Sequence, residues 1–157
     1  MKSVLHFSLL LLGVSAILFA QKVQVTSDTM KAYENKKEVH FIGNARVSKL
    51  KDWVHGAEIT VYFDENNETK KYVAQGDVTF ELHQKNALYK GKADRVTYLP
   101  KKSEYILTGN AVIDDLINKR HVDGNEIILD MTTGNANVRG DRRKPVKFIF
   151  DMEKKGE

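Results

Sequence analysis

The stretch Tyr105-Ile106-Leu107-Thr108-Gly109-Asn110-Ala111-Val112-Ile113 decides the fold, because its apolar side chains alternate across a central glycine. An alternation of period two over nine residues is typical of a β-strand and does not fit a helix with 3.6 residues per turn. A glycine inside a strand marks a bulge or a bend, and an adjacent Asn tolerates irregular backbone. The stretch therefore predicts a long strand that bends at Gly109. Its expected inward residues are Tyr105, Leu107, Ala111 and Ile113.

Three other stretches resemble this one, and their glycines are evenly spaced. Gly43, Gly76, Gly109 and Gly140 are separated by 33, 33 and 31 residues. A fixed period of this length predicts a repeated supersecondary unit. Counting in twos from Gly43 and Gly76 again yields one apolar face that continues through the glycine. Those faces contain Val39, Phe41, Ala45 and Val47 in one copy, and Tyr72, Ala74, Val78, Phe80 and Leu82 in the next.

A second repeated segment lies between the glycines, at residues 56–63, 91–98 and 124–129, with a partial copy at 27–33. Polar turns at 34–37, 64–71, 100–103 and 132–135 separate the strands, as expected of antiparallel hairpins. The inward residues of two copies are Val96 with Tyr98, and Ile127 with Leu129. In the first copy the choice between Ile59, Val61 and Phe63 and the opposite face, Thr60 and Tyr62, stays open. The last expected strand covers residues 145–150, and no segment after residue 21 predicts a helix.

Units with one apolar face and no covering helix must curl so that their faces meet, or stack as a solenoid. The inward residues mix large side chains with alanines and glycines. Such a set is compatible with a filled core, and also with an open slot between bent strands that is fit for acyl chains. The residues alone leave both interiors open.

The N-terminus has the layout of a secretory signal peptide. Lys2 precedes an apolar run over residues 4–20, and small Ala20 stands before polar Gln21. We expect a signal peptide over residues 1–20, a single domain over 21–150 and a flexible tail over 151–157. Retention of the run as a membrane anchor is the alternative. An exported chain without cysteine fits a bacterial periplasm.

Composition excludes several classes of protein. The 157 residues are 41% apolar and 29% charged, which does not suit a disordered chain, and the formal charge of +4 is too small for a nucleic-acid footprint. The absence of cysteine excludes a disulfide scaffold and a thiolate metal site. The histidines have no metal-ligand spacing and no nucleophile motif is present, so we expect no metal, no cofactor and no catalytic residue. Asp114-Asp115 is interpreted as a solvated strand end.

The copies G-N-A-x-V and G-D-V-x-F, the segment A-D-R-V-T-Y and the run from Lys101 to Ala111 together resemble the LptA/OstA family of periplasmic lipopolysaccharide-transport proteins. The resemblance extends from about Val23 to Phe150. It implies an all-β, OstA-like β-jellyroll of V-shaped antiparallel strands, and a carrier or bridge that shields lipid A acyl chains between the inner and outer membranes. It also implies head-to-tail self-association, and an LptC-like inner-membrane protein and an LptD-like outer-membrane protein as partners. No reaction is implied.

Two sets of residues follow from this resemblance and the strand faces. The expected lipid groove is lined by Met30, Val39, Phe41, Ala45, Val47, Tyr72, Val78, Phe80, Leu82, Val96, Tyr98, Leu107, Ile113, Ile127 and Leu129. Exposed edge strands are templates for added strands, so the expected partner edges contain Val23, Val25, Val146, Phe148 and Phe150. The basic runs 36–37, 70–71, 101–102 and 142–144 either contact lipid phosphates or are solvated turns. A membrane-anchored, LptC-like adaptor or a β-scaffold that acts only through protein contacts is the alternative function.

Overall fold

A computed structural model of the chain describes residues 22–152, so the expected signal peptide and most of the expected tail lie outside the described residues. Those residues form a single ten-stranded antiparallel sheet with two short 3-10 turns. The strands are β1 (Gln24–Thr26), β2 (Thr29–Tyr33), β3 (Glu38–Lys49), β4 (Asp52–Phe63), β5 (Thr69–Gln84), β6 (Ala87–Leu99), β7 (Glu104–Asp115), β8 (Arg120–Asp130), β9 (Ala136–Arg139) and β10 (Lys147–Phe150). The 3-10 turns are η1 (Glu34–Lys36) and η2 (Pro100–Lys102). The all-β expectation is confirmed.

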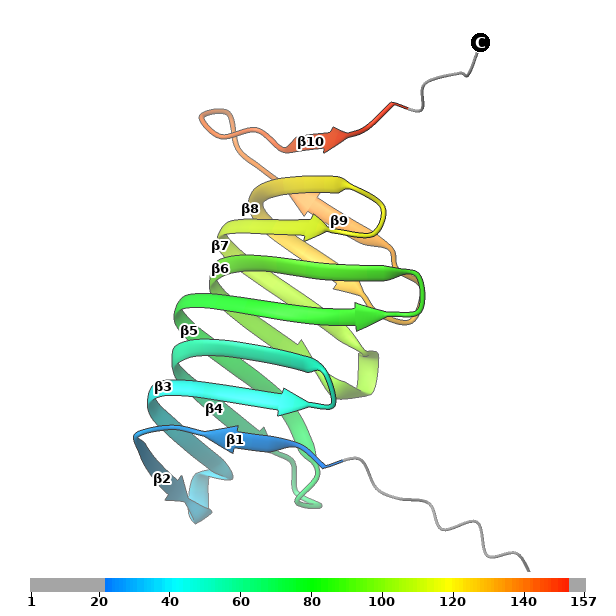
Figure 1. Cartoon of the computed structure of the whole chain (residues 1–157). Helices are drawn as coiled ribbons and strands as arrows, with labels where there is room; N and C mark the ends of the chain where they lie inside the picture. Colours follow the sequence, from blue (N-terminus) through cyan, green and yellow to red (C-terminus); the bar gives the residue numbers. More distant parts are fainter. Residues whose placement is uncertain (1–21, 153–157) are drawn as a thin grey trace, which may run out of the picture.

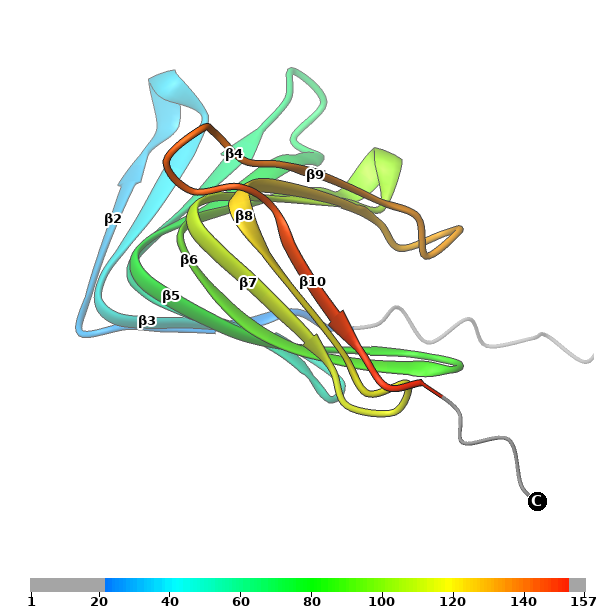
Figure 2. The ribbon, with the colours of Figure 1, turned by 90° about the horizontal axis from the view of Figure 1, so that it is seen from above.

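The sheet is folded over so that its two halves face each other. Strands β3 to β8 pair with their neighbours in sequence order, and each bends near its middle. Seen from above, the halves form a V whose walls meet along one crease and open at a mouth on the other side (Figure 2). One half of each long strand lies in the wall that ends in β1 and β10, and the other half lies in the wall that ends in β2 and β9. We call these the β1–β10 wall and the β2–β9 wall.

Left-handed backbone at a glycine and the following residue produces the bend in three of the strands. In β5, Gly76 has φ +82° and Asp77 has φ +45°, and β3 and β7 contain the same arrangement at Gly43-Asn44 and Gly109-Asn110. Pairing with the neighbouring strands is interrupted at these positions and resumes on the other wall. L-residues rarely adopt this backbone, and Gly, Asn and Asp are those that tolerate it best. The G-N and G-D dipeptides of the repeat are therefore its hinges, as predicted.

The bend also brings neighbouring strands close together. A methyl group placed on Gly76 would lie 2.6 Å from the Cβ of Ala57, and one placed on Gly43 would lie 2.5 Å from an oxygen of Asp28. Asp28 is held in place by its own backbone, because its N–H donates to the carbonyl of Gly43 at 2.9 Å. The crease thus needs glycine for its backbone conformation and for the space that a side chain would fill.

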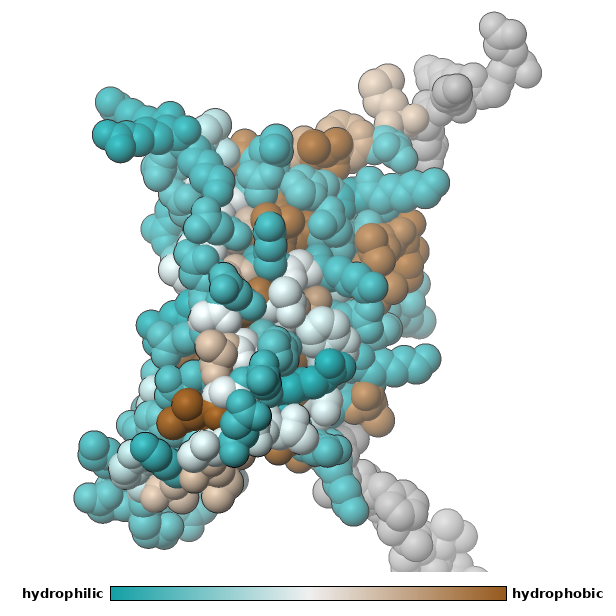
Figure 3. Space-filling view, turned by 60° about the vertical axis from the view of Figure 1, so that its left-hand side comes forward, coloured by the Kyte–Doolittle hydropathy of each residue, from teal (hydrophilic) through white to brown (hydrophobic). Residues whose placement is uncertain are grey.

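The two edges of the sheet lie at opposite ends of the molecule (Figure 1). At the first end, β1 and β2 pair with the two halves of β3, and at the last end β10 and β9 pair with the two halves of β8. The final strand begins at Lys147, two residues later than expected. Within residues 22–152 no helix is long and apolar enough to cross a membrane. The crease side of the molecule is covered mostly by hydrophilic residues (Figure 3).

Candidate functional site

The interior between the walls is built from rows of side chains that cross the sheet. Residues opposite each other on paired strands share a face, so the pairing register identifies each row. Above the crease, a row on the β2–β9 wall consists of Phe41, Ile59, Ala74, Val96, Leu107, Ile127 and Val138. The facing row on the β1–β10 wall consists of Val25, Val47, Val54, Phe80, Gly91, Ile113, Val122 and Phe148. Both rows are wholly apolar.

In the half of the molecule nearer β1 the walls leave a cavity of about 440 Å³. Both walls line it, with Val47, Val54 and Leu82 on one side and, on the other, Ile59, Ala74, Val96 and three tyrosines, Tyr72, Tyr98 and Tyr105. Pockets for small molecules usually have volumes of roughly 300–1,000 Å³ and mostly apolar linings. The cavity has the size and lining needed to hold part of an apolar ligand.

In the half nearer β10 the interior is filled instead. Phe80 is 2% exposed, and its ring occupies the space above Gly91, where a methyl group would lie 2.6 Å from the ring. Leu107 and Ile127, on the facing row, are fully buried. The interior therefore combines the two arrangements that the sequence left open, with a packed core at one end and a cavity at the other.

The residues expected to line the groove all lie on the inward faces, but at different depths. Met30 is 60% exposed at the first end of the sheet. Val39, Phe41, Val47, Tyr72 and Tyr98 are half-buried. The remaining nine are buried, namely Ala45, Val78, Phe80, Leu82, Val96, Leu107, Ile113, Ile127 and Leu129. Only Val47, Tyr72, Leu82, Val96 and Tyr98 of the expected set line the cavity.

Other residues that line the cavity were missing from the expected set. Ile59 lies inward with Val61, opposite Phe41 and Val39, so the register that the sequence left open is now established. Val54 lies opposite Val47 across the two-residue turn 50–51 that joins β3 and β4. A hairpin's turn length determines its register, so this pairing was available from the sequence. Ala74 and Tyr105 had been placed on the inward face but not in the groove.

The row at the mouth is more polar than the deeper rows. On the β2–β9 wall, Tyr72, Tyr98 and Tyr105 are neighbours on β5, β6 and β7. Burial raises the pKa of Tyr98 and that of Tyr105 above the ordinary value, and the charge of Asp52 on the opposite wall raises both further. Both phenols are therefore neutral at physiological pH.

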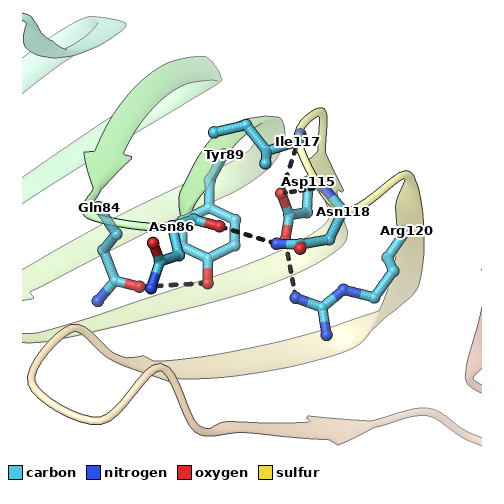
Figure 4. A network of polar contacts seen from close by, with 7 residues as sticks. All are labelled: Gln84, Asn86, Tyr89, Asp115, Ile117, Asn118 and Arg120. Atoms are coloured by element: carbon cyan, nitrogen blue, oxygen red, sulfur yellow. Dashed lines mark hydrogen bonds and ion pairs between the residues drawn. The ribbon is translucent and has the colours of Figure 1, made fainter.

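Asp115 lies at the mouth on the opposite, β1–β10 wall, where it pairs with Tyr89. The prediction that it is a solvated strand end is wrong. Its side chain is 4% exposed and accepts hydrogen bonds from Arg120 Nη2 at 2.8 Å and Asn118 Nδ2 at 2.7 Å (Figure 4). Burial opposes ionisation of the carboxyl group, but these hydrogen bonds outweigh it and lower the pKa of Asp115. Asp114 does lie on the opposite, outer face, where it contacts His121.

A hydrogen bond spans the mouth in the filled half. Gln84 at the end of β5 belongs to the β1–β10 wall, and its Nε2 donates to the backbone carbonyl of Met131, just after β8 on the other wall. The hydroxyl of Tyr89 in turn donates to Gln84 Oε1 at 3.4 Å (Figure 4). The two walls are thus tied together between the end of β5 and the end of β8.

Charged groups on the outer faces mostly bind one another. His40 lies between Glu38 and Glu58, and His121 between Asp114 and Asp123, at 2.6–3.1 Å. Hydrogen bonds to these carboxylates raise the pKa of both histidines. Within the described residues no group of three or more His, Cys, Asp and Glu could hold a metal ion. Of the basic runs, Lys101 contacts Asp64 at 3.2 Å and Lys37 contacts Asn67 at 2.7 Å.

The expected partner edges expose apolar side chains, except that Val25 on β1 is half-buried. Val23, Val146, Phe148 and Phe150 are 42–57% exposed, and Phe148 stacks on Phe150 with ring centroids 5.3 Å apart. Phe148 lies opposite Val122, so the two rings extend the inward face to the last strand. Strands β2 and β9, which were not in the expected set, form the edges of the other wall.

A folded-over antiparallel sheet with an apolar interior and a cavity open at the mouth defines an open β-jellyroll. Residues 24–135 match the family described as LptA/(LptD N-terminal domain) LPS transport protein, and the chain belongs to this family. It is a family of transport proteins, not of enzymes. A comparison with curated proteins found no match.

A similar solved structure is that of LptH, the LptA homologous periplasmic component of the lipopolysaccharide transport device from Pseudomonas aeruginosa. The TM-score is 0.74 at 15% identity, over 84% of this chain and 96% of the other. At this identity the likeness establishes the fold, and it confirms the expected jellyroll.

Proposed function

We propose that this protein is a periplasmic carrier of lipopolysaccharide that shields lipid A acyl chains and passes the lipid from the inner to the outer membrane. The observation that carries the proposal is the cavity between two apolar walls, in a chain of the lipopolysaccharide transport family. In this proposal residues 1–20 direct export and are removed, and residues 21–150 act as one domain. The expected groove residues Val47, Tyr72, Leu82, Val96 and Tyr98 line this cavity, and the other ten continue the inward face beyond it.

The polarity of the interior supports an amphiphilic ligand. Both rows above the crease are apolar, whereas the row at the mouth contains tyrosine hydroxyls and the carboxylates of Asp52 and Asp115. Acyl chains buried in the deeper rows would leave water, which contributes about 0.8 kcal/mol for each methylene group. A polar head group would then lie at the mouth, where it remains hydrated.

The ends of the sheet support assembly with partners that share the fold. Apolar inward residues reach both ends, with Met30 at the first strand pair and Phe148 and Phe150 at the last. A strand added to either edge would satisfy free backbone groups and cover these side chains. We propose a second copy, an LptC-like inner-membrane protein and an LptD-like outer-membrane protein as the partners.

Photocrosslinking in living cells tests the proposal with a pair of matched tyrosines. A benzoylphenylalanine probe at Tyr72 would face the cavity, whereas one at Tyr62 would face outward, where Lys71 Nζ lies 4.6 Å from the ring centroid. We expect crosslinks to lipopolysaccharide from position 72 and none from position 62. Protein crosslinks alone, with no lipid from position 72, would contradict the carrier and favour the adaptor that acts only through protein contacts.

A further inference from the structure

Three tyrosine rings form a ladder along the mouth of the cavity. Tyr72, Tyr98 and Tyr105 lie opposite one another on β5, β6 and β7 and all line the cavity. The rings of Tyr98 and Tyr105 are stacked with centroids 4.4 Å apart, and Tyr72 lies 6.1 Å from Tyr98 at a tilt of 31°. This packing fixes the three phenols on one rigid row.

The ladder contains phenol hydroxyls that donate no hydrogen bond to another group among the described residues. The hydroxyl of Tyr98 lies beside Ser103. Among residues 22–152 no hydrogen bond involves the hydroxyl of Tyr72 or Tyr105, and no side-chain oxygen or nitrogen there is both buried and without a partner. These two hydroxyls are therefore accessible from the cavity as hydrogen-bond donors.

The opposite wall carries both signs of charge at this level, since Lys49 and Asp52 are paired on β3 and β4 and both line the cavity. Asp52 faces the ladder across the cavity, close enough for its charge to act on Tyr98 and Tyr105. Its Oδ1 accepts hydrogen bonds from the backbone N–H of His83 at 2.8 Å and from His83 Nδ1 at 3.1 Å. A phosphate beside this carboxylate would be repelled, whereas neutral oxygen atoms would accept hydrogen bonds from the phenols.

We infer that the tyrosine ladder binds the neutral linkage region of an amphiphile, the ester and amide carbonyls that join acyl chains to the head group. This inference rests on the proposed function and adds a position to it. The acyl chains lie in the apolar rows below the ladder, the carbonyls accept hydrogen bonds from the phenols, and the phosphates lie outside the mouth. The ladder thus sets the depth to which the lipid enters.

Removing only the hydroxyls tests the inference. The triple variant Tyr72→Phe, Tyr98→Phe and Tyr105→Phe keeps all three rings and their stacking, and Tyr62→Phe removes a hydroxyl from the outer face as a control. Two probes are titrated into each purified protein, namely lipopolysaccharide and the uncharged apolar dye N-phenylnaphthylamine, which contains no carbonyl group. We expect the triple variant to bind lipopolysaccharide roughly 10-fold more weakly and the dye with unchanged affinity.

The possible outcomes separate the two proposals. A wild-type protein that does not bind lipopolysaccharide would overturn the carrier itself. Wild-type binding that the triple variant retains in full would overturn the ladder alone, as would an equal loss for both probes, because the hydroxyls would then act only through packing. Thermal unfolding of each variant checks the fold, and the three single variants replace the triple one if it unfolds.

Discussion

At the scale of single residues, the crease depends on positions where a side chain has neither space nor a favourable backbone. Gly76 combines both requirements, since its φ is positive and Ala57 occupies the space above it. Gly134, in the turn between β8 and β9, has a similar φ of +77°, but its nearest neighbour for an added methyl group is 3.6 Å away. A substitution at Gly134 would therefore introduce backbone strain alone, whereas one at Gly76 would add steric overlap to it.

We predict that Gly76→Ala lowers the free energy of unfolding by about 2–3 kcal/mol, whereas Gly134→Ala lowers it by only about 1 kcal/mol. The difference reflects the overlap with Ala57, so Ala57→Gly introduced together with Gly76→Ala should recover part of the loss. Urea unfolding followed by circular dichroism measures all four proteins. Equal losses for the two single variants would show that the crease needs glycine only for its backbone.

Single residues also mark where sequence reasoning was sufficient and where it was not. The parity of Tyr105, Leu107 and Ile113 around Gly109 predicted strand, bend and inward face, because alternation is local information. Asp115 was misplaced since its burial depends on Arg120 and Asn118, which return from the next turn to satisfy the carboxylate. The filling of the space above Gly91 by Phe80 depends on how closely the walls approach, which no pattern within one strand encodes.

At the scale of elements, a cluster of charges on the outer face joins β10 to the rest of the sheet. His121 Nδ1 contacts Asp114 on β7 at 2.6 Å and its Nε2 contacts Asp123 at 3.0 Å, while Lys147 on β10 contacts Asp123 at 3.4 Å. Strand β10 has only four residues, all exposed, so this cluster and its backbone pairing with β8 hold it in place.

We predict that this cluster makes stability depend on pH. The pKa of His121 in the folded protein is raised above 6.5 by its two carboxylates, so the stabilisation is complete below pH 6.5 and is lost as the pH rises through the folded value. His121→Gln should therefore reduce the free energy of unfolding more below pH 6.5 than well above it, by up to about 1 kcal/mol. His55→Gln is the control, because His55 forms none of the ion pairs seen among residues 22–152.

Urea unfolding about one unit below and about two units above pH 6.5 measures the effect. The Asp123 carboxylate titrates below this window, since its hydrogen bond to His121 and the charge of Lys147 lower its pKa. A loss in His121→Gln that is the same at both pH values would contradict the prediction.

At the scale of the whole molecule, the two ends differ in how much apolar surface they offer. The last strand exposes Phe148, Ile149 and Phe150 together, whereas β1 and β2 expose Met30 among polar neighbours. A head-to-tail contact between unlike ends is heterologous, so it repeats as an open chain unless its rotation closes it into a ring.

We predict that replacing Phe148 and Phe150 by lysine weakens self-association at least ~10-fold, because charges on an edge oppose strand addition. Leu50→Lys is the matched control, since Leu50 is 81% exposed in the turn after β3 and lies on neither edge. Sedimentation velocity at increasing protein concentration measures the association. Equal weakening by Leu50→Lys, or a wild-type protein that stays monomeric, would contradict assembly through this edge.

The hydrogen bond from Gln84 to Met131 has a mechanical consequence, because both walls are halves of the same strands and can separate only by rotation about the crease. This hydrogen bond joins the end of β5 on one wall to the residue after β8 on the other, so it restrains the walls at one place along the mouth. A rotation that widens the mouth is restrained most at the Gln84–Met131 hydrogen bond, and its amplitude increases with distance from that bond toward β1. A bulky ligand therefore costs the least elastic energy at the β1 end. A ligand that moves along the crease away from β1 meets increasing resistance until the Gln84–Met131 hydrogen bond breaks.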